Sequence, residues 1–183
     1  MMMQTLAHVM LQQPALADRL DVDQVLARLD VHYGATAGLH AQAYPGCMQA
    51  LGSLRNAGVK LACLTNKEHR YAIKVLQATK LFGLFDYVVG GDSLAHRKPH
   101  PQTLRHVLNV LGGEARRAAH LGDSRTDVET ARAAGVDAWA VPWGYNAGEP
   151  IAACNPHRIF NSLPEVAEFV LEANAERCPA PHR

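Results

Sequence analysis

The chain has 183 residues, of which 48% are apolar and 19% are charged, and its formal net charge is +1. This length suits one domain with a sizeable buried core, together with part of a second. The Lys and Arg residues are scattered rather than clustered, which argues against a nucleic acid or an anionic membrane surface as the main partner.

The segment before Gly58 is expected to be mostly helical. Apolar residues recur at helical spacing within 4–12 and within 22–33, where they are Val22, Val25, Leu26 and Leu29. Residues 34–46 have the composition of a linker and end in a Pro-Gly turn. Helical periodicity then resumes over residues 48–54.

From residue 59 onward, strands and helices alternate. Apolar runs predict strands at 59–65, 85–91, 117–122 and 137–144, with a short one near 158–160. Helices are predicted at 68–79, 101–111, 126–135 and 164–173, followed by a frayed, flexible tail at 174–183. Strands that are apolar throughout are typical of a parallel sheet with helices on both faces, so the predicted fold is a three-layer, Rossmann-like α/β domain.

Ligands of such sheets bind beyond the carboxyl ends of the strands, and three of these ends carry suitable polar residues. The first is LTNK, where Thr65 ends a strand just before a helix. Its hydroxyl, together with backbone N–H groups and the helix dipole, suits a phosphate oxygen. The alternative is that Thr65 or Asn66 only caps the helix.

The second is the loop HRKPHP. Pro99 favours an extended backbone at Lys98, which would direct its ammonium group across the sheet edge toward a phosphate. The alternative is a solvated loop lysine. His96 and His100 have the spacing of a helical metal pair, but the intervening proline argues against a helix, and we interpret them as loop residues.

The third is GDSRTD. Asp123 lies at a strand end, where a carboxylate can reach a hard cation such as Mg²⁺. Asp127, at the start of the next helix, is placed to fix the waters of that cation or Lys98. A capping pair with Ser124 is the alternative for Asp127, and it leaves Asp123 unexplained.

This order of motifs resembles the haloacid-dehalogenase-like (HAD) hydrolase superfamily, whose pattern is a strand ending in Thr or Ser, then a lysine, then G-D-x-x-x-D. Within it, LTNK, VVGGDSLAHRKPHP, LGDSRTD and WGYNAGEP look most like the phosphoglycolate phosphatases. The resemblance runs from about residue 44 to 170. It implies a HAD-like core at 44–173, preceded by the remnant of a helical cap at 1–43.

The resemblance implies a Mg²⁺-dependent phosphomonoester hydrolase acting on a small phosphorylated carboxylic acid, with 2-phosphoglycolate the first choice. It further implies that Thr65, Asn66 and Lys98 bind the phosphoryl group, that Thr65 and Lys98 serve catalysis, and that Asp123 and Asp127 form the metal site.

The family also uses an aspartate nucleophile, on an apolar strand followed by D-x-D-G-T, and this sequence contains no such motif. Its only D-x-D is Asp21-Val22-Asp23, which continues into a helical face and is interpreted as a helix N-cap or first-turn acid. By resemblance, the chain begins within the cap and lacks the central strand of the sheet with the nucleophile and the acid/base. We therefore expect it to be inactive alone, and marginally stable or prone to aggregate.

Two alternatives stay open. One is a non-catalytic, phosphate-binding remnant, and the other is a different HAD-like reaction, such as that of a sugar-phosphate phosphatase, a mutase or a dehalogenase. A dinucleotide-binding domain fits poorly, because no strand is followed by G-x-G-x-x-G.

The expected compartment is the cytoplasm. The four cysteines form no Cys-x-x-Cys pair, no apolar run approaches the about 20 residues of a membrane span, and the start has no basic region typical of a signal peptide.

Overall fold

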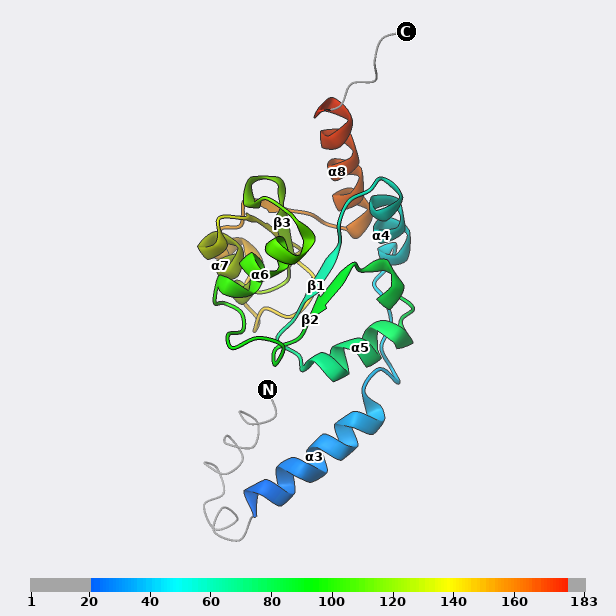
Figure 1. Ribbon diagram of the computed structural model, residues 1–183, viewed down its shortest axis with the longest axis vertical. Coiled ribbons are helices and arrows are strands. Elements are labelled where there is room, and N and C mark those ends of the chain that lie inside the picture. Colours follow the sequence, from blue (N-terminus) through cyan, green and yellow to red (C-terminus); the bar gives the residue numbers. More distant parts are fainter. Residues whose placement is uncertain (1–20, 178–183) are drawn as a thin grey trace.

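The computed structural model describes residues 21–177 and has the predicted α/β organisation (Figure 1). The helix predicted at 4–12, and residues 178–183 of the predicted tail, lie outside the described residues. No helix of the described part is long and apolar enough to span a bilayer.

The predicted helices are all present within residues 21–177. They are α3 (Val22–Thr36), α4 (Cys47–Asn56), α5 (His69–Ala78), α6 (Gln102–Leu111), α7 (Arg125–Ala134) and α8 (Leu163–Arg177). Short 3-10 turns at Phe82–Leu84, Ala115–Arg117 and Ile151–Cys154 were not predicted.

Two helices run at least three residues past their predicted C-terminal ends. Helix α3 continues through Thr36, into the segment interpreted as a linker. Helix α8 continues to Arg177, so residues 174–177 are helical rather than frayed. Ala and Glu favour a helix, and the sequence has no helix breaker in this stretch before Pro179.

The strands form two parallel sheets. In the first, β1 (Ala62–Leu64) pairs with β2 (Tyr87–Val89). In the second, β3 (Ala119–Gly122) pairs with β4 (Asp137–Ala140), which pairs with β5 (Arg158–Ile159). Among the described residues no ladder joins β1 to β3, so each of these strands has a partner on one side only.

This division also changes the predicted burial. Strand β1 is half-buried throughout and β3 begins with an exposed Ala119, although both were expected to be buried strands. Each ladder is also shorter than its apolar run. For β1 and β3 the reason is physical: a strand that has no neighbour on one side within residues 21–177 keeps part of its surface open and forms fewer ladder hydrogen bonds.

The main core lies between α6, α7 and the second sheet, and its most buried members include Val128, Ala131, Val136 and Ala138. Helices α4 and α8 pack on each other at one end of the molecule (Figure 1).

Helix α3 extends from the other end of the molecule (Figure 1). None of its residues is buried, and Val31 is 70% exposed. The interpretation of Asp21 as an N-cap is confirmed, because its side chain accepts a hydrogen bond from the Gln24 N–H at 3.1 Å. The lone D-x-D therefore begins a helix.

Candidate functional site

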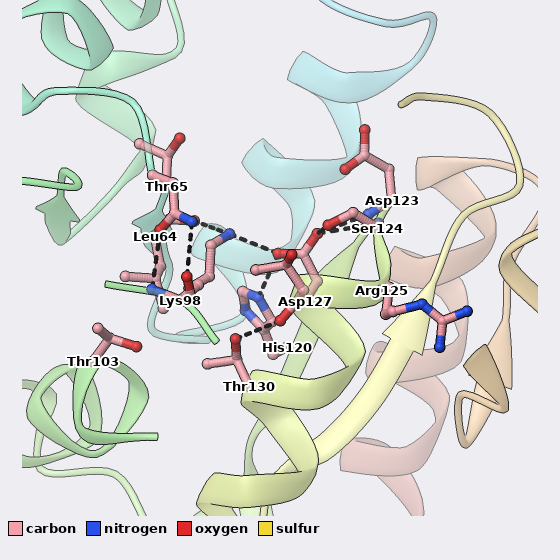
Figure 2. Close-up of polar contacts among 12 residues, drawn as sticks. Leu64, Thr65, Lys98, Thr103, His120, Asp123, Ser124, Arg125, Asp127 and Thr130 are labelled. Carbon is pink, nitrogen blue, oxygen red and sulfur yellow. Dashed lines mark hydrogen bonds and ion pairs between the residues drawn. The ribbon is translucent and has the colours of Figure 1, made fainter. Parts of the chain in front are cut away.

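The predicted polar residues gather at the carboxyl ends of the two sheets. Thr65 follows β1, Asp123 follows β3, Lys98 comes from the loop between β2 and α6, and Asp127 lies in the first turn of α7. Figure 2 shows Thr65 and Asp123 pointing the same way, on opposite sides of the contact between Lys98 and Asp127.

A buried ion pair lies at the centre of this group. The Lys98 Nζ is 2.6 Å from Asp127 Oδ1, and the two side chains are only 11% and 6% exposed. The same ammonium donates to the Leu64 carbonyl at 2.9 Å. The alternative of a solvated loop lysine is therefore wrong.

The bond to Leu64 places the ammonium at the open edge of β1. The Thr65 N–H donates to the Val89 carbonyl in β2 at 3.0 Å, so Thr65 faces the paired side. Neighbouring residues of a strand direct their backbone groups to opposite sides, and the Leu64 carbonyl consequently faces the unpaired side. Lys98 thus connects this open edge with α7, in the second half of the molecule.

The carboxylate of Asp127 is fully engaged. Besides Lys98, His120 Nε2 lies 3.1 Å from Oδ1 and donates to it, since an ionised carboxylate only accepts. Its Oδ2 accepts the hydroxyl of Ser124 at 2.6 Å and the backbone N–H groups of Ser124 at 3.2 Å and Asp123 at 3.3 Å. Asp127 thus caps α7 and holds Lys98 at once, so the two interpretations are not exclusive.

These contacts fix the charge of Asp127. Burial alone would raise the pKa of its carboxyl, but the hydrogen bond from His120, the charge and hydrogen bond of Lys98, and the hydroxyl of Ser124 outweigh burial and hold that pKa well below its usual range. A charged, saturated carboxylate of this kind suits an anchor for Lys98 better than a direct metal ligand.

The glycine of the G-D pair has a steric role. A Cβ added at Gly122 would lie 2.2 Å from the Cβ and Cγ of Asp127. Only glycine lets α7 bring Asp127 this close to the end of β3.

Asn66 follows β1 and positions Lys98, whose loop follows β2 of the same sheet. Its side-chain amide donates to the Lys98 carbonyl at 2.9 Å, and its side-chain oxygen accepts the Lys98 N–H at 3.0 Å. Neither Thr65 nor Asn66 caps α5, because the first N–H of that helix, from His69, donates to Asp92 Oδ1 at 2.6 Å. The capping alternative for LTNK is therefore wrong.

Asp123 is the carboxylate that has capacity left for a ligand. Its Oδ2 accepts the N–H of Tyr145 at 2.8 Å, and within residues 21–177 its Oδ1 has no hydrogen-bond partner. A Cβ at Gly144 would lie 2.4 Å from Oδ2, so glycine is needed where the GYN loop approaches this carboxylate.

Mg²⁺ fits such a site when it keeps several waters, because it is commonly held by one or two carboxylates plus phosphate oxygens. The described residues contain no group of three or more His, Cys, Asp or Glu side chains that could hold a metal by themselves. A cage made of protein ligands alone is therefore not available in this part of the chain.

Three features of the site could not be found from the motifs. These are the contact of His120 with Asp127, the clamp of Asn66 on Lys98, and the Tyr145 N–H on Asp123. The position of His120 on a strand otherwise made of small and apolar residues is the one signal that the sequence offered. His96 and His100 lie outside the helices, as expected, with their rings stacked 3.9 Å apart.

Comparison with known proteins identifies relatives of most of the chain. A family model described as haloacid dehalogenase-like hydrolase matches residues 3–135. A phosphoglycolate phosphatase from Thiobacillus denitrificans is 35% identical over 150 residues, which are 82% of this chain and 66% of that protein. One from Pseudomonas syringae pv. tomato is 38% identical over 169 residues, covering 88% of this chain and 62% of that protein.

Solved structures agree with these relatives. The crystal structure of a predicted phosphoglycolate phosphatase from Haemophilus somnus matches with a TM-score of 0.67 and 31% identity, over 69% of this chain and 56% of that one. The chain spans less than two thirds of the length of each of these three proteins.

Proposed function

Because the chain belongs to the haloacid dehalogenase-like hydrolase family, we propose that it supplies the phosphate-binding and cation-binding residues of a Mg²⁺-dependent phosphatase of the phosphoglycolate phosphatase type. The proposed substrate is a small phosphorylated carboxylic acid, 2-phosphoglycolate, cleaved to glycolate and phosphate. The observation that carries the proposal is the buried pair of Lys98 and Asp127, placed between Thr65 and Asp123 at the strand ends.

The hydrogen-bonding capacity of each side chain supports a defined role. An ammonium has three protons, and Lys98 uses two on Asp127 and on the Leu64 carbonyl, which leaves one for a phosphoryl oxygen. The Thr65 Oγ1 accepts the Lys67 N–H at 3.1 Å, so its own O–H remains available as a second donor.

Asp123 would hold the cation through its second carboxylate oxygen. A bound Mg²⁺ supplies positive charge that neutralises the phosphoryl oxygens during transfer. Asp127 acts through Lys98, which it holds in place.

The proposed reaction also needs a nucleophilic carboxylate. The 183 residues contain no D-x-D-G-T motif, and the Asp21 carboxylate begins α3. We therefore assign the nucleophile to residues outside these 183, on a strand lying along the open edge of β1. Support comes from Lys98, which already places a cation at this edge.

A fusion protein tests this proposal. An apolar strand followed by D-x-D-G-T is joined to the chain through a flexible linker, and phosphate release from 2-phosphoglycolate is measured with and without Mg²⁺. We expect Mg²⁺-dependent release that is lost in Asp123→Asn and in Lys98→Met. A folded fusion protein that hydrolyses no phosphomonoester would refute the proposed activity.

The second candidate is a protein that binds phosphate without turnover. It is favoured by the completeness of the Asp127 contacts, which leave the cluster stable in a chain with no nucleophile motif. This candidate predicts Mg²⁺-dependent phosphate binding by the chain, lost in Asp123→Asn, with no hydrolysis even by the fusion protein.

The domain division and the compartment are further parts of the proposal. Helix α3 stands apart from both sheets (Figure 1), which supports residues 1–43 as a cap remnant and 44–173 as the core. Cys47, Cys63 and Cys154 are unpaired among the described residues, which supports the reducing cytoplasm as the compartment.

A further inference from the structure

A contact between the loop after β1 and helix α3 brings a second lysine close to the candidate site. The ammonium of Lys67 meets the hydroxyl of Tyr33, on α3, and lies 4.9 Å from the centroid of its ring. Lys67 belongs to the same turn as Thr65, whose Oγ1 accepts the Lys67 N–H at 3.1 Å. The Lys67 carbonyl also accepts the N–H of Gly91 at 2.7 Å, so the backbone from which this side chain starts is fixed.

The charges around this contact are paired, with one exception. Asp30 forms an ion pair with Arg70 and accepts the hydroxyl of Tyr71, and Glu68 lies 3.1 Å from Arg70. Within residues 21–177, Lys67 forms no ion pair, and its ammonium contacts on α3 are with the hydroxyl and the ring of one residue, Tyr33. A half-buried ammonium without a counter-charge is a favourable partner for a bound anion, because its positive charge is not neutralised by a carboxylate.

Among the described residues, neither Lys98 nor Arg125 is placed to bind a second anionic group. Lys98 already binds Asp127 and the Leu64 carbonyl, and its last proton is assigned to the phosphate. Arg125 is exposed at the start of α7, and Figure 2 shows its guanidinium directed away from Thr65 and Lys98.

We propose that Lys67 binds the carboxylate of the substrate while Thr65 and Lys98 bind its phosphate, an inference that rests on the function proposed above. Tyr33 holds the ammonium when no ligand is bound, through its hydroxyl and the face of its ring. Lys67 is then the residue that distinguishes a phosphorylated carboxylic acid from inorganic phosphate.

Binding to the unmodified 183-residue chain tests this inference without need of turnover. The affinities for 2-phosphoglycolate and for inorganic phosphate are measured separately by ³¹P NMR titration in Mg²⁺. We expect Lys67→Gln to lower the affinity for 2-phosphoglycolate at least about tenfold, because one charge-assisted contact is lost. The affinity for phosphate should change less than about twofold. Lys67→Arg keeps the cation and is expected to keep the preference for 2-phosphoglycolate.

A matched control comes from Lys74, which also joins the core to α3, through its Nζ and the Gly34 carbonyl at 2.8 Å. Lys74→Gln is expected to change neither affinity. If it reproduces the effect of Lys67→Gln, attachment of α3 is responsible and the inference is overturned. The inference is also overturned if Lys67→Gln lowers the affinity for both anions equally, or for neither.

The inference and the proposed function fail in different ways. If the unchanged chain binds phosphate but Lys67→Gln does not weaken the binding of 2-phosphoglycolate, only the role of Lys67 is refuted. If the unchanged chain binds neither anion, both the role of Lys67 and the proposed function are refuted.

Discussion

Removing the charge of Asp127 should destabilise the fold more than any other single change at the site. Asp127→Asn keeps the shape of the side chain, but it leaves the Lys98 ammonium, 11% exposed, without a counter-charge. The NH₂ of the new amide also has to face one of two sets of hydrogen-bond donors, and it cannot accept from them. These sets are Lys98 with His120, and the groups of Ser124 with that of Asp123. Breaking a buried ion pair by removing one partner costs about 3–5 kcal/mol, and we expect a loss in that range.

Asp123→Asn is the matched control. Asp123 accepts one backbone N–H within the described residues, and an Asn oxygen can accept it equally well. The expected loss is about 1 kcal/mol or less. Urea unfolding at pH 7 followed by circular dichroism measures both values, with the midpoint for Asp127→Asn lowered by roughly 1–3 M.

A double variant makes the reasoning sharper. Replacing both members of a buried ion pair is often nearly neutral, so Lys98→Met added to Asp127→Asn should restore stability instead of reducing it further. The coupling free energy between the two positions is expected to be about 3 kcal/mol. Additive losses in the double variant, or an Asp127→Asn variant as stable as Asp123→Asn, would show that the pair does not hold the two sheets together.

Three further predictions concern the same network and helix α3. Gly122→Ala should lower the free energy of unfolding by about 1–3 kcal/mol or more, because the new Cβ would lie 2.2 Å from the Cβ of Asp127, and urea unfolding measures this. The stability that Asp127 contributes should be fully present above its unfolded pKa near 4 and be lost progressively as the pH falls from there through its lower folded pKa. The difference in stability between the unchanged chain and Asp127→Asn should therefore be the same at pH 7 and pH 5 and shrink below pH 4. The hydrogen bond to Asp30 raises the pKa of Tyr71 to about 12, so titration of tyrosinate absorbance should show one late component, absent in Tyr71→Phe.

Local patterns predicted the elements of this fold well. Apolar runs located each strand, and helical periodicity located α4 through α7, because both signals depend on the residues of the segment itself. The three strand-end motifs were also sufficient to bring Thr65, Lys98 and Asp123 into one region, since parallel strands end at the same edge.

The sequence offered one contact across the fold that the structure contains, that of Asp127 with Lys98, and it missed others. The cap of α5 comes from Asp92, on the loop after the next strand, and the clamp on Lys98 comes from Asn66, more than thirty positions earlier. Such contacts depend on how the elements pack, which periodicity does not encode.

The open edge of β1 has a consequence for hydrogen exchange. The Thr65 amide is bonded to the Val89 carbonyl, whereas the Leu64 backbone faces the side without a strand. Alternate amides along β1 should therefore exchange with solvent at very different rates, slow at Thr65 and fast at Leu64. A strand that came to lie along this edge would slow exchange at Leu64 and leave Thr65 unchanged, so a single amide reports whether the sheet is continuous.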